Sequence, residues 1–105
     1  MKKNKQTFTN SSQYKPRNKK EQRLIDALVL LKNEKEVADF LRDLLTLPEI
    51  EEFANRLEIA YLLTKGIPYK KIADLTGVST TTVTRVAYWL FHGCGGYKRV
   101  IDNLV

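Results

Sequence analysis

The stretch from Tyr69 to Val86, which reads YKKIADLTGVSTTTVTRV, decides the fold of this 105-residue chain. Ile72, Ala73 and Leu75 predict a short helix that buries one apolar face. Such a helix needs a partner to cover that face, and the residues that follow it provide one. We therefore expect two packed helices joined by a tight turn.

The residues after the first helix carry the turn and the start of the second helix. Gly77 tolerates the left-handed conformation of a tight turn, and Val78 is expected to be a buried bridge. Ser79 is a good N-cap residue. Val83 and Val86 lie three residues apart, so both face inward from the second helix. This order of residues is typical of a helix-turn-helix motif, which we place at residues 69–91.

The second helix leaves its other side chains pointing outward, and these are mostly threonines. Threonine is a poor helix former, so a hydroxyl-rich surface helix indicates that the hydroxyls have a use. Together with the preceding helix, they form a candidate DNA-binding set of Tyr69, Lys70, Lys71, Ser79, Thr80, Thr81, Thr82, Thr84 and Arg85. The alternative to DNA binding is that this helix is only a capped helix, which packs on a neighbour in a small helical protein.

The net charge of +6 is unevenly distributed along the chain. Residues 1–20 hold seven basic residues and no acid, whereas residues 21–58 hold ten acids against five bases. The positive charge therefore collects on the N-terminal tail and around the helix-turn-helix. Basic surfaces attract polyanions through counterion release, so double-stranded DNA is the expected partner. An RNA-binding or protein-interaction adaptor that keeps the motif as a scaffold is the alternative function.

Length and composition narrow the class of protein. A chain of 105 residues forms one domain, and no apolar run approaches the ~18 residues of a membrane span. The basic N-terminus has no following apolar segment, so it is not a signal peptide. A single cysteine, Cys94, fits a reducing cytoplasm. We expect a cytoplasmic protein with no membrane partner.

The apolar spacing predicts an all-α domain at residues 21–105 that follows a disordered basic arm at residues 1–20. The arm has Phe8 and Tyr14 as its only large apolar groups. Thr46 and Glu49 form an expected capping box. The six expected helices are Glu21–Lys32, Glu34–Leu45, a third from the capping box to about Lys65, the two helices of the motif, and Tyr97–Leu104.

The first helix predicts a homodimer. Seven of the eight residues from Leu24 to Leu31 are apolar, with Asp26 as the exception. A helix that is apolar on all sides must be covered on all sides, and the other short helices supply too little cover. A second copy of the chain is the simplest cover, and two-fold symmetry would present two recognition helices to DNA.

Enzyme or metal chemistry is not expected. His92 and Cys94 lie two residues apart, but they make only half of a tetrahedral metal site. They also lack a third residue to complete a catalytic group. We therefore predict no catalytic residue, no metal site and no cofactor. Trp89, Phe91 and Tyr97 are expected to pack the core.

Several pieces of the chain together resemble the Trp repressor family, and most closely its YerC/YecD-like branch. They are LLTLPEIEEFANRL at residues 44–57, GIPYKKIADLTGVS at 66–79, TTTVTRV at 80–86, and the glycine-rich G-x-G-G-Y at 93–97. This resemblance implies an intertwined, all-helical homodimer. It also implies repression of transcription at palindromic DNA sites.

The resemblance also implies a ligand slot. In the Trp repressor, tryptophan lies between two arginines, which Arg56 and Arg85 match, and Thr46 matches a further pocket residue. Val86 replaces a glycine of the family, and Trp89 replaces a serine that helps to hold the amino group. The loop before the motif is also one residue shorter. We therefore expect DNA binding without tryptophan as corepressor, and the sequence identifies no other effector.

Two arrangements of the slot remain open at this point. In the first, the indole of Trp89 leans toward the two arginines and fills the slot. In the second, Trp89 packs against the partner subunit and the slot has collapsed.

Overall fold

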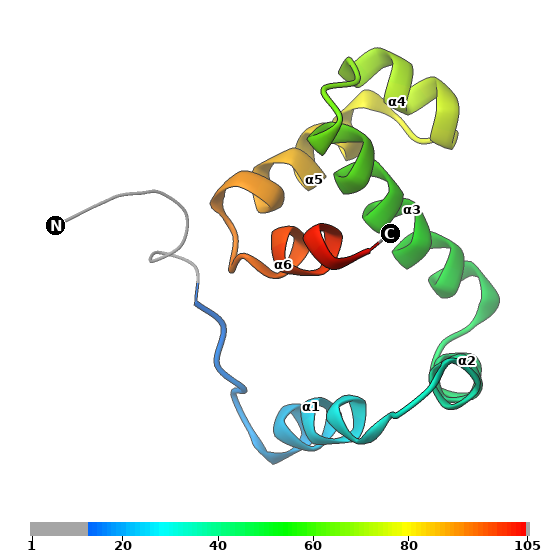
Figure 1. Cartoon of the computed structure of the whole chain (residues 1–105), viewed down its shortest axis with the longest axis vertical. Coiled ribbons are helices and arrows are strands. Elements are labelled where there is room, and N and C mark those ends of the chain that lie inside the picture. The colour runs from blue at the N-terminus through cyan, green and yellow to red at the C-terminus, as the bar shows by residue number, and fades with distance from the viewer. Residues whose placement is uncertain (1–12, 105) are drawn as a thin grey trace, which may run out of the picture. The chain divides into compact units, whose positions relative to one another are not determined.

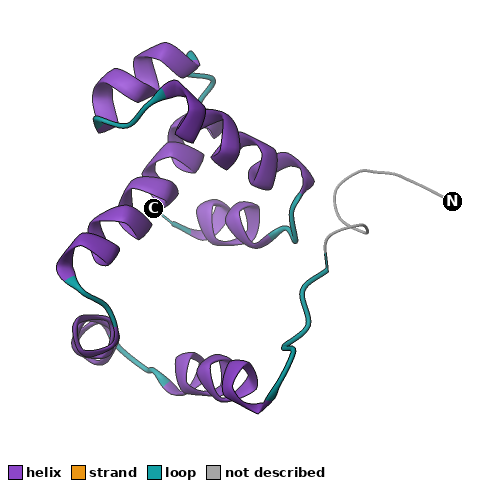
Figure 2. Cartoon of the chain, turned by 180° about the vertical axis from the view of Figure 1, so that it is seen from behind, coloured by secondary structure: helices purple, strands orange, loops and turns teal. Residues whose placement is uncertain are grey.

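The computed structural model describes residues 13–104, and six α-helices account for most of them (Figures 1 and 2). Within these residues there is no β-strand, as the sequence predicts. The helices are α1 (Lys19–Leu30), α2 (Glu34–Leu44), α3 (Leu47–Thr64), α4 (Tyr69–Thr76), α5 (Thr80–His92) and α6 (Gly96–Asn103).

Two compact units divide the described chain, with the boundary inside α3. We call Tyr14–Phe53 the N-terminal unit. We call the other unit, whose described residues are Gln13 and 54–104, the helix-turn-helix unit. The described part of the second unit contains the C-terminal turns of α3 together with α4, α5 and α6.

The helix-turn-helix unit contains all the buried core residues of the described chain. Ile59, Ile72 and Val83 are the largest fully buried side chains, and they come from α3, α4 and α5 respectively. Three successive turns of α5 face the core through residues at three- and four-residue spacing. The full set of buried residues is Ile59, Ala60, Leu63, Ile72, Ala73, Val83, Val86, Ala87, Leu90 and Ile101.

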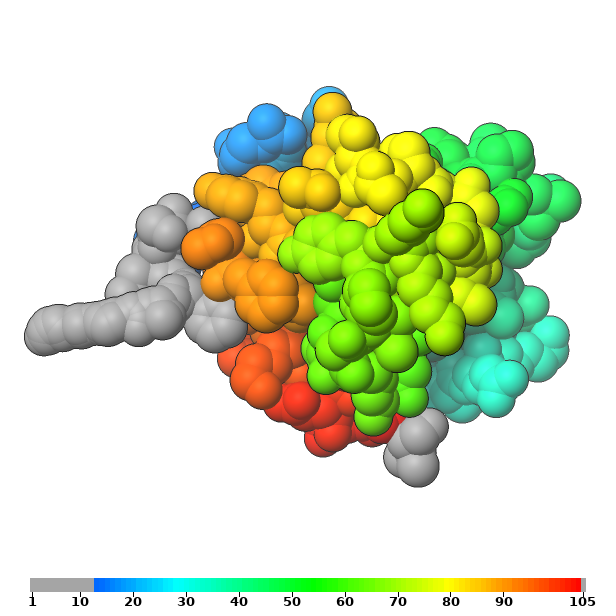
Figure 3. Space-filling model, turned by 90° about the horizontal axis from the view of Figure 1, so that it is seen from above, coloured from blue at the N-terminus to red at the C-terminus, as the bar shows by residue number. Residues whose placement is uncertain are grey.

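The turn between α4 and α5 has the predicted geometry. Gly77 has φ +79°, and its amide donates to the Ala73 carbonyl at 2.9 Å, which closes α4. Val78 is partly buried against the core. Ser79 then caps α5, because its hydroxyl accepts a hydrogen bond from the Thr82 amide at 3.2 Å. Figure 3 looks onto the face where α4 and the first turns of α5 lie together.

One residue of the motif does not behave as the sequence suggests. Leu75 was expected to share the buried face of α4, but 60% of it is exposed. The buried face is centred between Ile72 and Ala73, which are adjacent in sequence. At about 100° per residue, Leu75 lies about 110° from that centre, so it points away from the core.

The N-terminal unit has no buried core of its own. Neither α1 nor α2 contains a buried residue. Leu28 is 44% exposed, Val29 is 77% exposed and Leu30 is 70% exposed. The apolar surplus of α1 therefore remains uncovered within the single chain.

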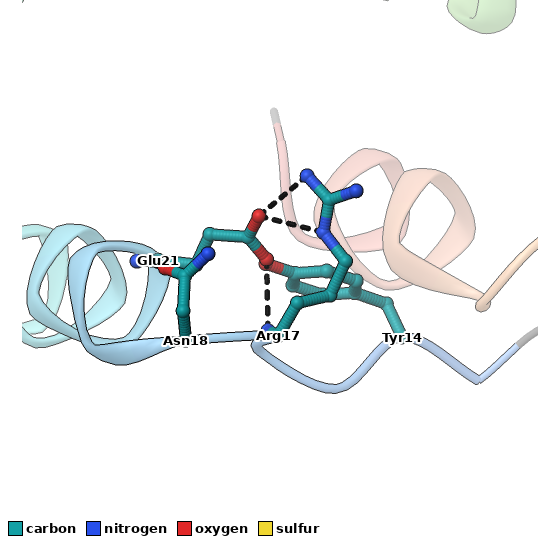
Figure 4. A network of polar contacts seen from close by, with 4 residues as sticks. All are labelled: Tyr14, Arg17, Asn18 and Glu21. Atoms are coloured by element: carbon teal, nitrogen blue, oxygen red, sulfur yellow. Dashed lines mark hydrogen bonds and ion pairs between the residues drawn. The ribbon is translucent and has the colours of Figure 1, made fainter.

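The beginning of α1 is fixed by polar contacts around Glu21 (Figure 4). The Tyr14 hydroxyl and the Arg17 amide both donate to Glu21 Oε1, at 2.7 and 2.9 Å. Arg17 Nε donates to Glu21 Oε2 at 2.7 Å. The hydrogen bonds from Arg17 and Tyr14 lower the pKa of Glu21 from its usual 4.5 to about 2.

These contacts start α1 at Lys19, two residues before the expected position. Asn18 is the N-cap, and its side chain accepts from the Glu21 amide at 3.0 Å. Residues 13–18 of the predicted arm are thus described, whereas residues 1–12 lie outside the described structure. The predicted arm ended at residue 20, but Lys19 and Lys20 lie in α1, so this boundary is wrong. For residues 1–12 the disordered arm stays a prediction.

The start of α3 confirms the predicted capping box. The Thr46 amide donates to Glu49 Oε1 at 2.9 Å, and the Glu49 amide donates to Thr46 Oγ1 at 3.2 Å. The helix ends at Thr64, just before Gly66, which has φ +77°. From residue 13 to residue 104, the helices are too short or too polar for any of them to cross a lipid bilayer.

The turn between α4 and α5 gives a direct stability test. Gly77→Ala should lower the free energy of unfolding by about 1–2 kcal/mol, because alanine disfavours the left-handed conformation. No atom lies within 4 Å of the position of the added Cβ, so the cost is conformational and not steric. Gly96→Ala is the matched control, since Gly96 lies in α6 with open space around it.

Urea denaturation of both glycine variants measures the difference. The control should retain the wild-type stability or gain up to about 1 kcal/mol. Equal destabilisation of the two variants would contradict the account of the turn.

The contacts around Glu21 predict a local pH dependence. The folded state lowers the pKa of Glu21 to about 2. The contribution of this carboxylate to the stability of the folded state is therefore fully present above its usual pKa of 4.5. It should be lost as the pH falls toward 2. NMR signals of the Tyr14 ring should therefore titrate with a midpoint near 2 in the wild type. In Glu21→Gln, which has no carboxyl at this position, the Tyr14 signals should show no such titration. A midpoint near 4.5 would show that the contacts do not form.

Candidate nucleic-acid interface

The first turns of α5 present hydroxyl groups on the surface. Thr80, Thr81, Thr84 and Arg85 are exposed, while Val83 and Val86 hold the opposite face of the helix in the core. The Thr84 hydroxyl donates to the Thr80 carbonyl at 3.0 Å, and its oxygen can still accept a hydrogen bond. The helix therefore offers short polar side chains on a rigid support.

Thr82 differs from the other threonines because it belongs mainly to the helix cap. It is partly buried, and its hydroxyl lies 3.2 Å from the Ser79 hydroxyl. Both groups thus hold the beginning of α5. The structure brings Thr80, Thr81, Thr84 and Arg85 together as the exposed surface of the helix.

The beginning of α4 adds basic groups to the same unit. Tyr69, Lys70 and Lys71 are exposed, and the first turn contains no acidic residue. The N-terminus of a helix carries a partial positive charge, which adds to that of the lysines. Residues 69–92 contain three basic residues and one acidic residue, Asp74. The charge of this surface favours an anionic partner.

A cavity of about 410 Å³ lies between α3, α5 and α6 within the helix-turn-helix unit. Its lining residues are Arg56, Arg85, Val86, Trp89 and Tyr97. The structure therefore brings together four of the five residues predicted for a ligand slot. The fifth, Thr46, belongs to the N-terminal unit, where it forms the capping box of α3.

Trp89 forms a wall of this cavity and does not fill it, contrary to the first expected arrangement of the slot. Its side chain is 54% exposed, and about 410 Å³ remains open beside it. The Tyr88 ring meets the indole edge-on, with 5.5 Å between the ring centroids. Gly93 is buried against Trp89: an added Cβ would lie 2.3 Å from the Trp89 carbonyl oxygen and 3.1 Å from its Cε3.

The expectation that Trp89 and Phe91 pack the core is wrong for this chain. They flank the buried Leu90 in sequence, so each is rotated by about 100° from the inward direction. Phe91 is 51% exposed. Tyr97, by contrast, packs against the core as expected. Burial raises the pKa of Tyr97, and the positive charge of Arg56 partly opposes this increase.

Tyr97 is also a lining residue of the cavity that sequence reasoning missed. It lies 41 positions after Arg56 in the chain, and no local spacing connects the two. The glycine-rich loop after α5 reverses the chain, with Gly95 at φ +84°, and begins α6 beside the cavity. The only signal in the sequence was this glycine loop directly before an aromatic residue.

Other polar groups do not form a metal site. Within residues 13–104, no three His, Cys, Asp or Glu side chains lie close enough to hold a metal ion. Cys94 is exposed, in the middle of the loop that joins α5 to α6.

Comparisons with known proteins agree with this geometry. The family model of the Trp repressor protein matches residues 19–105. The protein YerC of Bacillus subtilis is 38% identical over 90 residues, which cover 86% of each chain.

Solved structures show the same likeness. A TrpR-like protein from Eubacterium eligens superposes with a TM-score of 0.78 at 36% identity, covering 82% of this chain and 89% of that one. A structure from Staphylococcus aureus gives a TM-score of 0.76 at 34% identity, covering 82% and 86% of the two chains.

Proposed function

Because the chain belongs to the Trp repressor family of helix-turn-helix regulators, we propose that it represses transcription as a sequence-specific DNA-binding homodimer. The observation that carries this proposal is the exposed surface of Thr80, Thr81, Thr84 and Arg85 on α5. It lies on the helix that the motif presents to a major groove. The basic first turn of α4 supports the proposal, since lysines there reach phosphates.

The two kinds of residue have different tasks in this proposal. Lys70, Lys71 and Arg85 neutralise phosphates and set the affinity for any duplex. Thr81 and Thr84 contact base edges, because threonine offers a hydroxyl for hydrogen bonds and a methyl group for the thymine methyl. Tyr69 and the residues of the α5 cap complete the contact with the backbone.

The homodimer is proposed from the surface of the N-terminal unit. Its helices expose Leu24, Leu28, Val29 and Leu30, with no buried residue in α1. Burial of such side chains contributes about 25 cal/mol per Å² of apolar surface, so a second copy gains stability by covering them. Two-fold symmetry also suits palindromic DNA, because each subunit then meets the same half-site.

We further propose that DNA binding needs no tryptophan. The five lining residues of the cavity include two guanidinium groups and no carboxylate. The carboxylate of an amino acid would find two guanidinium groups there, but its ammonium group would find no carboxylate among these five residues. Val86 and Trp89 stand where the family has a glycine and a serine, so their side chains occupy part of the slot and leave about 410 Å³ open. The second expected arrangement is wrong in one part, because a cavity of about 410 Å³ remains open and the slot has not collapsed. Its other part, the packing of Trp89 against the partner subunit, stays a prediction.

One observation favours the alternative of a protein-interaction adaptor. The second half of α5 exposes large aromatic side chains, with Tyr88 55% and Phe91 51% exposed. Exposed apolar side chains of this kind are common at interfaces. They occupy the end of α5 opposite to the hydroxyl-rich turns, so both functions can coexist on one helix.

DNA binding can be measured by fluorescence anisotropy with short duplexes at several salt concentrations. Arg85→Ala and Lys70→Ala should weaken binding to every duplex, and each should reduce the salt slope by about one charge. Thr81→Ala should instead change the preference among duplexes, at a cost of about 1–3 kcal/mol for the preferred one.

Lys98→Ala is the matched control for the lost charge. Lys98 lies in the same unit but pairs with Asp102 at 3.1 Å, so its removal should leave the affinity almost unchanged. If the wild type binds no duplex more tightly than non-specific DNA at low salt, the proposed function is wrong.

The dimer is tested by Leu28→Asp on α1. This change should unfold the protein and not release a folded monomer, because it places a charge where the partner covers an apolar helix. Arg23→Gln changes the net charge by the same amount on the same helix, and it should leave the dimer intact. Light scattering that finds a folded wild-type monomer at micromolar concentration would reject the homodimer.

Calorimetry with L-tryptophan tests the corepressor prediction. We expect no heat of binding, and we expect the same mobility shift of DNA with and without the amino acid. A clear heat together with a tryptophan-dependent shift would mean that Val86 and Trp89 leave room for the ligand and that the cavity is a corepressor site.

A further inference from the structure

The cavity between α3, α5 and α6 combines aromatic rings with positive charge. Arg56 and Arg85 contribute two guanidinium groups, and Val86, Trp89 and Tyr97 contribute apolar and aromatic surface. Its volume of about 410 Å³ falls within the range of about 300–1,000 Å³ that is usual for sites of small molecules. The cavity can therefore hold a whole small ligand.

The positive charge of this cavity is not balanced in its lining. The described lining residues include no carboxylate. Arg85 is exposed, and within residues 13–104 it takes part in no ion pair. Guanidinium groups bind carboxylates through paired, charge-assisted hydrogen bonds. An anionic group of a ligand therefore has a partner in this cavity, whereas a cationic group has none.

The aromatic part of the lining favours a ligand with a ring. Trp89 is 54% exposed, so much of its side chain remains available for contact. Tyr97 packs against the core and is held beside the cavity. Aromatic rings pack on a further ring in offset or edge-on arrangements, with centroids about 4.5–7 Å apart. The lining thus suits an aromatic ring that carries a carboxylate.

Two smaller hollows of the same unit lack this combination. A groove of about 240 Å³ between α4 and α5 has no arginine or lysine in its described lining. Its lining residues are Tyr69, Thr84, Ala87, Tyr88, Phe91 and His92. A hollow of about 360 Å³ on α6 contains Lys98 and Arg99, but Asp102 pairs with Lys98 at 3.1 Å, and no aromatic residue is among its described lining. Of these three sites, the cavity beside Trp89 offers both rings and unbalanced positive charge.

We propose that this cavity binds an aromatic carboxylate without an ammonium group, and that the bound ligand weakens DNA binding. The carboxylate lies between the guanidinium groups of Arg56 and Arg85, and the ring lies against Trp89 and Tyr97. The effect on DNA rests on the proposed function, whereas binding of the ligand does not.

The direction of the effect follows from Arg85, which belongs to two surfaces. It lines the cavity, and it is also an exposed residue that we propose to contact phosphates. A carboxylate paired with Arg85 neutralises the charge that a phosphate would meet, so the ligand and DNA compete for one side chain. By thermodynamic linkage, each weakens the binding of the other by the same factor. The ligand therefore acts as an inducer, in contrast to a corepressor.

Ligand binding can be followed through the fluorescence of Trp89, the single tryptophan of the chain, and by calorimetry. The test ligand is 3-phenylpropionate. Its amide removes the charge, and L-phenylalanine adds an ammonium group to the same skeleton. We expect 3-phenylpropionate to bind at least about tenfold more tightly than either comparison compound. Equally tight binding of one of them would overturn the proposal, and so would the absence of binding in both measurements.

Variants of the full chain test the position of the ligand. Arg56→Gln should weaken binding of 3-phenylpropionate by about tenfold, because one of the two charged partners is lost. Lys98→Ala is the matched control, since it removes one positive charge from the same unit outside the lining of the cavity, and it should bind the ligand as the wild type does. Circular dichroism checks that each variant is folded. An equal loss in both variants would overturn the proposal, because it would mean general attraction to a basic surface.

Fluorescence anisotropy with a duplex at constant ionic strength tests the effect on DNA. Saturating 3-phenylpropionate should weaken binding by the same factor as Arg85→Ala and should reduce the salt slope by about one charge. It should have no further effect on Arg85→Ala. Unchanged or tighter DNA binding in the presence of the bound ligand would overturn the inducer. If 3-phenylpropionate binds while the wild type binds no DNA, the ligand site stands and the proposed function fails.

Discussion

The packing of α4 on α5 across the turn at Gly77 is the constraint on which the rest of the structure depends. Ile72 and Val83 are both completely buried, and they fix how the two helices face one another. The left-handed turn at Gly77 and the cap at Ser79 allow this packing within three residues. The exposure of Thr81 and Thr84 follows, because each lies two residues before a buried valine and therefore about 160° around α5 from it.

The same packing divides the surface of α5 into three regions. Its first turns carry Thr80, Thr81 and Thr84, one later face closes the cavity with Trp89, and the other closes the small groove with Tyr88. A single amphipathic helix supports these regions because only four of its thirteen residues are buried. The N-terminal unit lacks comparable burial, and this is the reason that we propose a partner subunit to cover its apolar side chains.

Much of this fold could be predicted because local rules and tertiary packing agree. The turn at Gly77, the cap at Ser79 and the capping box at Thr46 each depend on residues close in sequence. The predictions that Leu75 and Trp89 are buried were wrong for a different reason. Hydrophobicity alone does not determine which apolar side chains of a helix a small core can cover. The arrangement of the cavity could be predicted only in part, because Arg56 and Tyr97 meet through the reversal of the chain after α5.

Selection of duplexes from a random DNA pool tests the central claim most directly. The claim is that two copies of the α5 surface read one palindromic site. We expect enriched sequences with two-fold symmetric half-sites whose centres are about 10–10.5 base pairs apart, or a multiple of this spacing. The enrichment should disappear with Thr81→Ala or change to other bases. A pool that remains random after selection, or half-sites without two-fold symmetry, would contradict this account.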